Sequence, residues 1–252
     1  MSDVPPPATI AYDLIGKPPA EADYVIVWCH GWGQSRQAFA AFPGAFPRAA
    51  HLLIDLPGFG QSPPPSAPWG TREFSEAVVA LLDKLGFTKP VVWIGHSHGG
   101  RMGLDMASRH GDRINALCLI AGAGLKRKRG LIEAAQLKAR IYAYKAAKML
   151  FGAKMQDKFG SADYRNAGPA MRATFVRVVN EDFTEQAKAI AAPTLLLYGA
   201  NDGETPPEIG ERLAKLIPRA ELSVLANQDH YSVLGAGRHV VIKRLTEFLA
   251  KL

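Results

Sequence analysis

The pattern most suited to covalent chemistry is Gly-His-Ser-His-Gly-Gly at residues 95–100, with Ser97 at its centre. The apolar run 91–94 leads directly into it, and a helix-like segment follows. In so tight a turn the serine takes an unfavourable backbone conformation with its hydroxyl at the tip, and side chains at Gly95 and Gly99 would collide. The spacing therefore predicts a nucleophilic serine on a strand–turn–helix elbow.

An attacking serine needs a base, and the base needs an acid that orients it. Of seven histidines, His230 follows the apolar run 221–225 and a short polar loop, a position where ligands bind at the carboxyl ends of parallel strands. Asp202, just after the run 194–198, is the predicted acid. Serine, acid and histidine then follow one another in the order known for nucleophiles on such elbows.

Glu204 and Asp229 are rival candidates for the orienting acid. Asp229 adjoins His230 in the chain, and side chains of chain neighbours seldom hydrogen-bond well enough to orient a ring. The order of the three residues favours Asp202 over both rivals.

Two backbone N–H groups are predicted to stabilise a developing oxyanion. One belongs to His98, the residue after the nucleophile, and the other comes from the loop 30–35, His-Gly-Trp-Gly-Gln-Ser. Glycines on both sides of Trp32 let its N–H face the pocket. The Trp32 side chain either walls the acyl site or only packs, and His30 is expected to hold the loop by hydrogen bonds.

The elements that must position these residues alternate between apolar strands and amphipathic helices. Several strand-like runs are continuously apolar, which is typical of parallel strands covered on both faces. The predicted fold is an α/β, doubly wound, mostly parallel sheet. The strand-like runs are residues 9–14, 24–29, 51–55, 91–94, 116–121, 194–198 and 221–225.

Capping signals mark several predicted helices. Thr71 is a predicted N-cap and Gly86 is placed to end the same helix. Thr205-Pro-Pro-Glu208 reads as a capping box with proline at the first helical position.

Residues 124–190 break the alternation, because they contain helical patterns without a strong strand. We interpret them as a helical cap, or lid, inserted into a core formed by residues 1–123 and 191–252. The insert carries 14 Lys and Arg against 6 Asp and Glu, while the rest of the chain carries 16 against 17. The candidate pocket walls are Trp32, His98, Leu125, Tyr142, Tyr144, Met149, Phe151, Phe159 and Phe175.

Together these motifs resemble the α/β-hydrolase superfamily over nearly the whole chain, and most of all its capped carboxylesterases and lipase-like enzymes. Haloalkane dehalogenase and epoxide hydrolase relatives carry Asp at the nucleophile, so serine here favours acyl chemistry. The matching segments are His30-Gly-Trp-Gly33, Asp55-Leu-Pro-Gly-Phe-Gly-Gln-Ser62, residues 95–100, Gly199-x-x-Asp202 and His230.

The resemblance implies a carboxylic-ester hydrolase that forms an acyl-enzyme on Ser97 with a small-molecule ester and needs no cofactor. An alternative is an esterase or thioesterase for an anionic or acyl-carrier-protein-bound substrate, recruited by the basic cap. The excess of Lys and Arg in the insert would also be expected if these residues only formed a solvated helix face without a role in substrate binding. Lactone opening, C–C bond hydrolysis, perhydrolysis and hydroxynitrile cleavage stay open, as does a non-catalytic binding protein on the same fold.

Other function classes find little support in the sequence. No apolar run approaches the roughly 20 residues that span a bilayer, and no secretory signal is visible, so we expect a cytoplasmic protein. Cys29 and Cys118 read as buried free thiols, and no metal-binding motif occurs. The basic run 126–129 lacks the features of a nucleic-acid site. The sequence does not indicate an oligomeric state.

Overall fold

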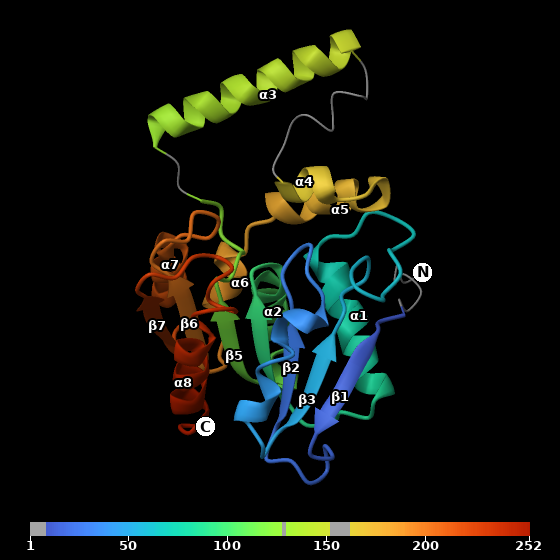
Figure 1. Ribbon diagram of the computed structural model, residues 1–252, viewed down its shortest axis with the longest axis vertical. Coiled ribbons are helices and arrows are strands. Elements are labelled where there is room, and N and C mark those ends of the chain that lie inside the picture. The colour runs from blue at the N-terminus through green and yellow to red at the C-terminus, as the bar shows by residue number, and fades with distance from the viewer. Residues whose placement is uncertain (1–8, 128–129, 152–161) are drawn as a thin grey trace.

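A seven-stranded sheet forms the centre of the computed structural model, which describes residues 9–127, 130–151 and 162–252 (Figure 1). The strand order is β1-β3-β2-β4-β5-β6-β7, with β1 antiparallel to β3 and all other neighbours parallel. This confirms the predicted doubly wound, mostly parallel sheet. The strands are β1 (Tyr12–Gly16), β2 (Val25–Cys29), β3 (Ala50–Ile54), β4 (Val91–His96), β5 (Ile114–Ile120), β6 (Thr194–Gly199) and β7 (Ala220–Leu225).

The first strand differs from its prediction. The apolar pattern placed it at residues 9–14, but pairing begins at Tyr12 and continues to Gly16. Its residues are mostly exposed, because β1 is the outer strand of the sheet and only β3 pairs with it. Pairing with β3, rather than the apolar run itself, therefore fixes the bounds of this strand.

Two apolar layers cover the two faces of the sheet, as the alternation of side chains along a strand requires. On β2, Val27 and Cys29 contribute to one layer and Ile26 and Trp28 to the other. The first layer includes α1 (Thr71–Lys84), α2 (His98–Arg109) and α7 (Pro207–Leu216). The second includes α8 (Arg238–Leu249), the short 3-10 turn η1 (Arg36–Phe39), and Phe42 and Phe46, which flank the 3-10 turn η2 (Pro43–Ala45). A third 3-10 turn, η3 (Gly111–Arg113), leads into β5.

Two of the predicted helix caps are wrong. Gly70, not Thr71, is the N-cap of α1, because the Thr71 hydroxyl and N–H both donate to the Glu181 carboxylate. Thr205 does not cap α7, which begins at Pro207. Each threonine hydroxyl bonds to a partner distant in sequence, and that contact prevails over local capping. Gly86, at φ +72°, ends α1 as predicted.

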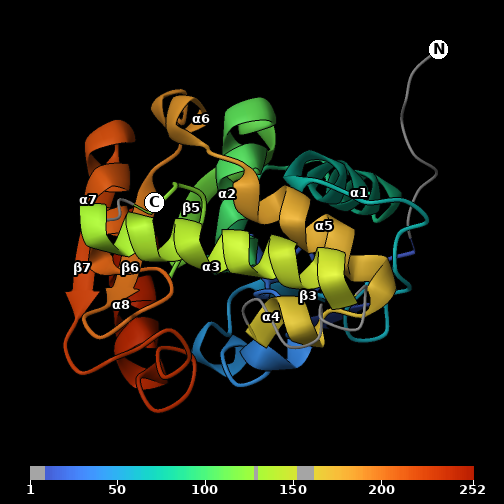
Figure 2. The same ribbon diagram turned by 90° about the horizontal axis from the view of Figure 1, so that it is seen from above.

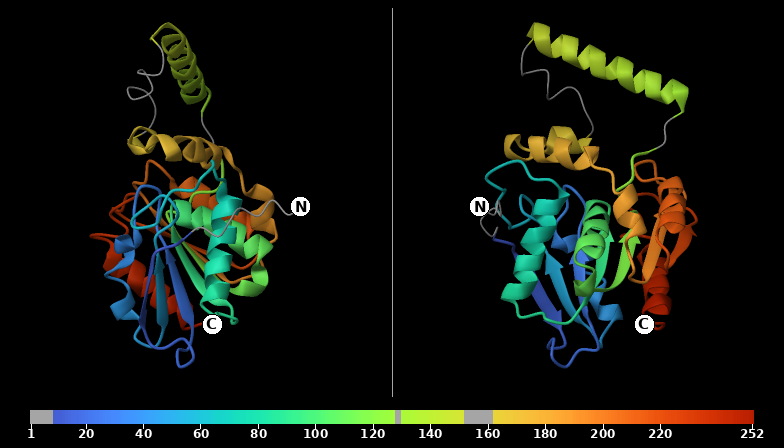
Figure 3. Two further views of the ribbon diagram at one scale, coloured as in Figure 1. Left: turned by 90° about the vertical axis from the view of Figure 1, so that its right-hand side faces the viewer. Right: turned by 180° about the vertical axis from the view of Figure 1, so that it is seen from behind.

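The described part of the insert is helical, with α3 (Leu131–Phe151), α4 (Ala162–Asn166), α5 (Pro169–Asn180) and α6 (Thr184–Lys188). Helices α4 and α5 lie over the carboxyl ends of the strands, and α3 lies beyond them, away from the sheet (Figures 1 and 3). Seen from above, α3 runs across the strand ends (Figure 2).

Helix α5 is tied to the core by polar contacts at the start of α1. The Trp69 N–H donates to Thr174 Oγ1 at 3.1 Å, and Arg177 forms an ion pair with Glu73 at 2.8 Å. Helix α3 reaches α4 through the hydroxyl groups of Tyr144 and Tyr164. The insert thus meets the core through these contacts of α5 and through α6, which packs against α2 and α7 with Ala187 buried.

Candidate active site

Ser97 occupies the sharp turn between β4 and α2, with φ 50° and ψ −107°. A non-glycine residue at positive φ is strained, as the predicted elbow requires. A Cβ on Gly95 would overlap the backbone of Gly99, and a Cβ on Gly99 would overlap the Cys29 carbonyl. Both elbow glycines are therefore demanded by close backbone approach.

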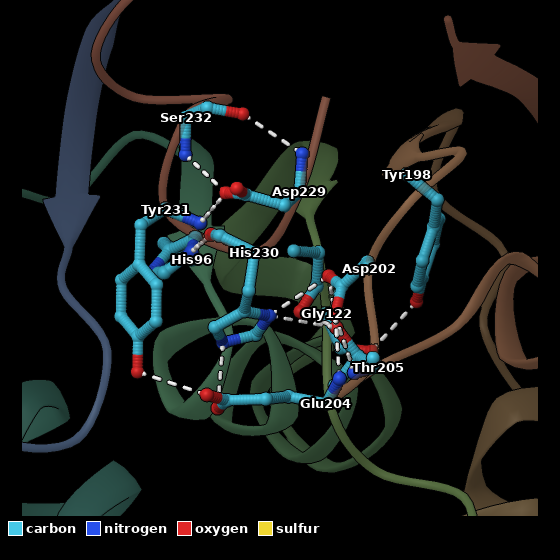
Figure 4. Close-up of polar contacts among 12 residues, drawn as sticks. His96, Gly122, Tyr198, Asp202, Glu204, Thr205, Asp229, His230, Tyr231 and Ser232 are labelled. Atoms are coloured by element: carbon cyan, nitrogen blue, oxygen red, sulfur yellow. Dashed lines mark hydrogen bonds and ion pairs between the residues drawn. The ribbon is translucent and has the colours of Figure 1, made fainter. Parts of the chain in front are cut away.

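Asp202 and His230 meet at the carboxyl ends of β6 and β7. Asp202 Oδ2 lies 2.8 Å from His230 Nδ1, and both side chains are buried (Figure 4). Asp202 Oδ1 accepts the N–H groups of Glu204 and Thr205, each at 2.8 Å. Burial opposes ionisation of Asp202, but His230 and these two N–H groups outweigh it and hold the Asp202 pKa below its ordinary value. The carboxylate is thus ionised and held against the ring.

The rival acids lie elsewhere around the same ring. The Asp229 carboxylate accepts the N–H groups of Tyr231 and Ser232, at 2.9 and 2.8 Å, and so shapes the loop. Glu204 lies on the opposite side of the imidazole, with Oε2 3.7 Å from His230 Nε2. Of the three acids, Asp202 is the one within hydrogen-bond distance of Nδ1.

Thr205 is a member of this network that the sequence did not reveal. Its hydroxyl lies 2.9 Å from Asp202 Oδ2, 2.9 Å from the Ala121 carbonyl and 3.1 Å from His230 Nδ1. It therefore braces both the acid and the ring against the end of β5. The capping-box pattern drew attention to helix capping, although the position three residues after Asp202 was the useful signal.

Ser97 and His230 lie on adjacent parts of the site without a hydrogen bond between them. Within the described residues, the polar contacts of the His230 ring are with Asp202, Thr205 and Glu204. His96, next to Ser97, contacts the His230 carbonyl through Nε2 at 2.8 Å, and the two rings are 4.9 Å apart. Catalytic hydrogen bonds are often long in ligand-free enzymes and tighten when substrate binds.

His96 also reaches the loop after β2. Its Nδ1 lies 3.0 Å from Gln34 Oε1, and the same oxygen accepts the Gly31 N–H at 2.8 Å. One buried imidazole thus links the loop that carries His230 to the loop that carries Trp32. Burial and the neighbouring His230 lower the His96 pKa to about 3, so the ring is neutral and its single N–H donates either to Gln34 Oε1 or to the His230 carbonyl. This bridge could not be predicted from local pattern, because it joins residues far apart in the chain.

The predicted oxyanion donors lie beside the elbow. His98 is the first residue of α2, where N–H groups lack helical partners. A Cβ on Gly31 would lie 3.2 Å from Ser97 Cβ, which places the neighbouring Trp32 backbone near the nucleophile. Within the described residues, neither the Trp32 nor the His98 N–H donates a hydrogen bond to another backbone group.

Two more histidines support this region in different ways. His30 fixes its loop, as predicted: Nδ1 lies 2.7 Å from the Gly31 carbonyl, and Nε2 accepts the Leu56 N–H at 3.0 Å. The His98 ring is buried against Trp32 and Phe74, with ring separations of 5.6 and 5.2 Å. Both of its nitrogens lack a partner in the described structure. Burial, Arg101 and His30 lower its pKa to about 3, so it is neutral.

A cavity of about 400 Å³ opens between the Trp32 loop, the loop 58–60 and helices α4 and α5. Trp32 lines it, and its ring packs 5.0 Å from Phe175. Tyr142 and Met149 are not walls of this cavity, because they are 69% and 84% exposed on α3. His98, Leu125, Tyr144 and Phe175 are also absent from its lining. The side chain of Phe151, and Phe159 altogether, lie outside the described residues.

Two family models match the sequence. The model described as alpha/beta hydrolase fold matches residues 24–185, more than half of the chain. The chain belongs to the α/β-hydrolase-fold family. A further model, described as TAP-like protein, matches residues 171–252 of this α/β hydrolase.

Relatives of this α/β hydrolase include esterases and other hydrolases. Pimeloyl-[acyl-carrier protein] methyl ester esterase of Chromobacterium violaceum is 30% identical over 228 residues, which cover 81% of this chain and 86% of that protein. A 2-hydroxy-6-oxononadienedioate/2-hydroxy-6-oxononatrienedioate hydrolase of a Pseudomonas species is 25% identical over 237 residues, covering 83% and 82%. These relatives confirm the predicted family and the class of ester-hydrolysing enzyme.

A solved structure confirms the fold of this α/β hydrolase. The enol-lactonase of Burkholderia xenovorans LB400 has a TM-score of 0.75 and 23% identity, and the match covers 96% of each chain. In the part of the chain that the structure describes, no helix is long and apolar enough to cross a membrane. No group of three or more His, Cys, Asp or Glu side chains there could hold a metal ion.

Proposed function

We propose that the chain hydrolyses carboxylic esters through an acyl-enzyme on Ser97, with His230 as base and Asp202 as the acid that orients it. The observation that carries this proposal is the strained Ser97 elbow beside a buried Asp202–His230 pair with a 2.8 Å hydrogen bond. The substrate is a small-molecule ester, and no cofactor takes part.

The geometry supports a two-step acyl transfer. Ser97 Oγ attacks the ester carbonyl while its proton passes to His230 Nε2, and Asp202 stabilises the imidazolium that forms. The N–H groups of Trp32 and His98 donate to the oxyanion. His230 then protonates the leaving alcohol, and the acyl group stays on Ser97. His230 next takes a proton from a water molecule, whose oxygen attacks the acyl carbonyl. As the bond to Ser97 Oγ breaks and the acid leaves, His230 returns that proton to Ser97 Oγ.

Two organisational features belong to the same proposal. Residues 124–190 act as a cap over a core made of residues 1–123 and 191–252, supported by the position of α4 and α5 over the strand ends. The unpaired, buried Cys29 and Cys118 fit a reducing compartment, and we place the enzyme in the cytoplasm.

The test is hydrolysis of short-chain p-nitrophenyl esters by the wild type and by Ser97→Ala. We expect kcat to fall about 10³-fold or more in the variant. Ser108→Ala is the matched control. Ser108 lies near the far end of α2, and among the described residues its hydroxyl bonds to the local Asp105 carbonyl, at 3.0 Å. Equal hydrolysis by Ser97→Ala and the wild type contradicts the proposal.

A second candidate is hydrolysis of an ester carried by an acidic carrier protein. The 30% identical esterase of Chromobacterium violaceum bears such a substrate in its name, and Lys138 and Lys145 are exposed on α3 of this chain. Steering by these lysines would make kcat/KM toward a carrier-bound ester fall as salt rises, while kcat/KM toward a free ester stays level. Equal salt dependence for both esters contradicts the steering role.

A further inference from the structure

A carboxylate lies at the reactive nitrogen of the catalytic histidine. Glu204, in the loop between β6 and α7, places Oε2 3.7 Å from His230 Nε2, the nitrogen that must exchange protons with Ser97 and the leaving group (Figure 4). Tyr231 holds this carboxylate by donating its hydroxyl to Glu204 Oε1 at 3.1 Å. Burial and the Glu204 charge raise the pKa of Tyr231 to about 12, so Tyr231 stays a donor at neutral pH.

A second carboxylate reaches the same region from the insert. Asp163, on α4, is half-buried and lines the 400 Å³ cavity together with Trp32 and Tyr231. Its pKa is raised by burial and by the negative charge of Glu204, while His230 acts in the opposite direction. Asp163, Glu204 and His230 are therefore close enough to interact. They come from α4, the β6–α7 loop and the β7–α8 loop, respectively.

Among the described residues, no Lys or Arg side chain forms an ion pair with either carboxylate. Across the described residues, Glu204 forms its ion-pair contact with His230, and Asp163 forms none with Lys or Arg. Arg127 approaches the loop, but it donates to the Gly203 carbonyl, at 3.0 Å. These two carboxylates therefore place negative charge at the mouth of the site, in contrast to the basic composition of the insert as a whole.

We propose that Glu204, assisted by Asp163, makes the site select esters that are uncharged near the reacting carbonyl and exclude those with an anionic group there. This selectivity rests on the ester-hydrolase function proposed above. An anion on the acyl chain would meet two like charges, the half-buried Asp163 and the exposed Glu204, and added salt should weaken this repulsion. A negative group remote from the ester would stay away from these charges, so carrier-bound acyl chains with an uncharged ester end remain acceptable.

The selectivity is tested with two p-nitrophenyl esters of equal acyl length, the valerate and the mono-ester of glutarate, at neutral pH. We expect kcat/KM to favour the uncharged valerate by about tenfold or more, which corresponds to about 1.4 kcal/mol. Glu204→Gln should lower this ratio by raising kcat/KM for the glutarate, and Asp163→Asn should lower it less. Glu247→Gln on α8 removes the same charge from an exposed residue outside the site and should leave the ratio unchanged. A ratio unaltered by Glu204→Gln overturns the proposal.

A binding measurement separates this proposal from the hydrolase function. The corresponding p-nitroanilides, one uncharged and one carrying the glutarate carboxylate, are amides that resist cleavage, and calorimetry gives their dissociation constants. We expect tighter binding of the uncharged anilide to the wild type and loss of that preference in Glu204→Gln. Equal affinity overturns the selectivity whether or not esters are hydrolysed. Absence of hydrolysis with the binding preference intact overturns only the hydrolase function.

Discussion

The strand-end loops and helix α3 lie on the same side of the molecule but are held in different ways. In the loops, His96, Asp202 and His230 are buried and joined by hydrogen bonds of 2.8 Å to partners far apart in sequence. On α3, Tyr142 and Met149 are 69% and 84% exposed. We therefore expect the chemistry to depend on the core and to tolerate changes of the exposed side chains on α3.

Among changes in the strand-end loops, we expect the largest loss of activity when the negative charge that orients His230 is removed. Asp202→Asn should lower kcat by about 10⁴-fold, because the amide favours the wrong imidazole tautomer. The rival Asp229→Asn should cost far less, since Asp229 bonds only to nearby groups of its own loop. Steady-state kinetics with a p-nitrophenyl ester measures both. A larger loss of kcat for Asp229→Asn than for Asp202→Asn would show that Asp202 is not the acid that orients His230.

The second largest effect is expected at His96, which links the loop that carries Trp32 to the loop that carries His230. His96→Leu removes the contacts to Gln34 and to the His230 carbonyl, and we expect kcat to fall about 10²-fold through misplacement of both loops. KM should change less than kcat, because His96 acts through the positions of the two loops that carry the reacting groups. His96→Gln, which keeps one donor, should recover part of kcat. If His96→Leu alters stability but not kcat, His96 only packs.

Thr205 gives a smaller effect within the same network. Thr205→Val keeps the shape of the side chain but removes the hydroxyl that lies 2.9 Å from both Asp202 Oδ2 and the Ala121 carbonyl. The lost hydrogen bond costs about 1–3 kcal/mol of stability, and we expect kcat to fall about tenfold. Thr205→Ser should restore both quantities, which are measured by urea unfolding and by ester hydrolysis. Wild-type behaviour of Thr205→Val would show that the hydroxyl is dispensable.

Changes on α3 should have the smallest effect. Met149→Ser and Tyr142→Ser replace exposed side chains, so the free energy of unfolding should move by no more than about 0.5 kcal/mol. Phe74→Ala, in the buried layer beside α2, should cost about 3–5 kcal/mol and sets the scale. Chemical denaturation measures all three variants. A loss above about 1 kcal/mol at Met149 would mean that α3 packs more closely than its exposure indicates.

The sequence predicted the parts of the site that depend on local pattern. A strand, a glycine-flanked serine and a helix define the elbow within one short segment, and Asp202 and His230 follow their own strands. Thr205 and His96 could not be assigned, because their partners come together only when the sheet forms. The position of Glu204 beside Nε2 of the His230 ring could not be predicted either, since the order of residues in the chain does not distinguish the two imidazole nitrogens.

Covalent labelling of Ser97 tests the central claim most directly. A fluorophosphonate probe should add one adduct per chain, located by peptide mass spectrometry at Ser97, and Ser97→Ala should stay unlabelled. Because Asp202 sets the orientation of His230, Asp202→Asn should label far more slowly. An unlabelled wild-type protein, or an adduct on another residue, would contradict a nucleophilic Ser97.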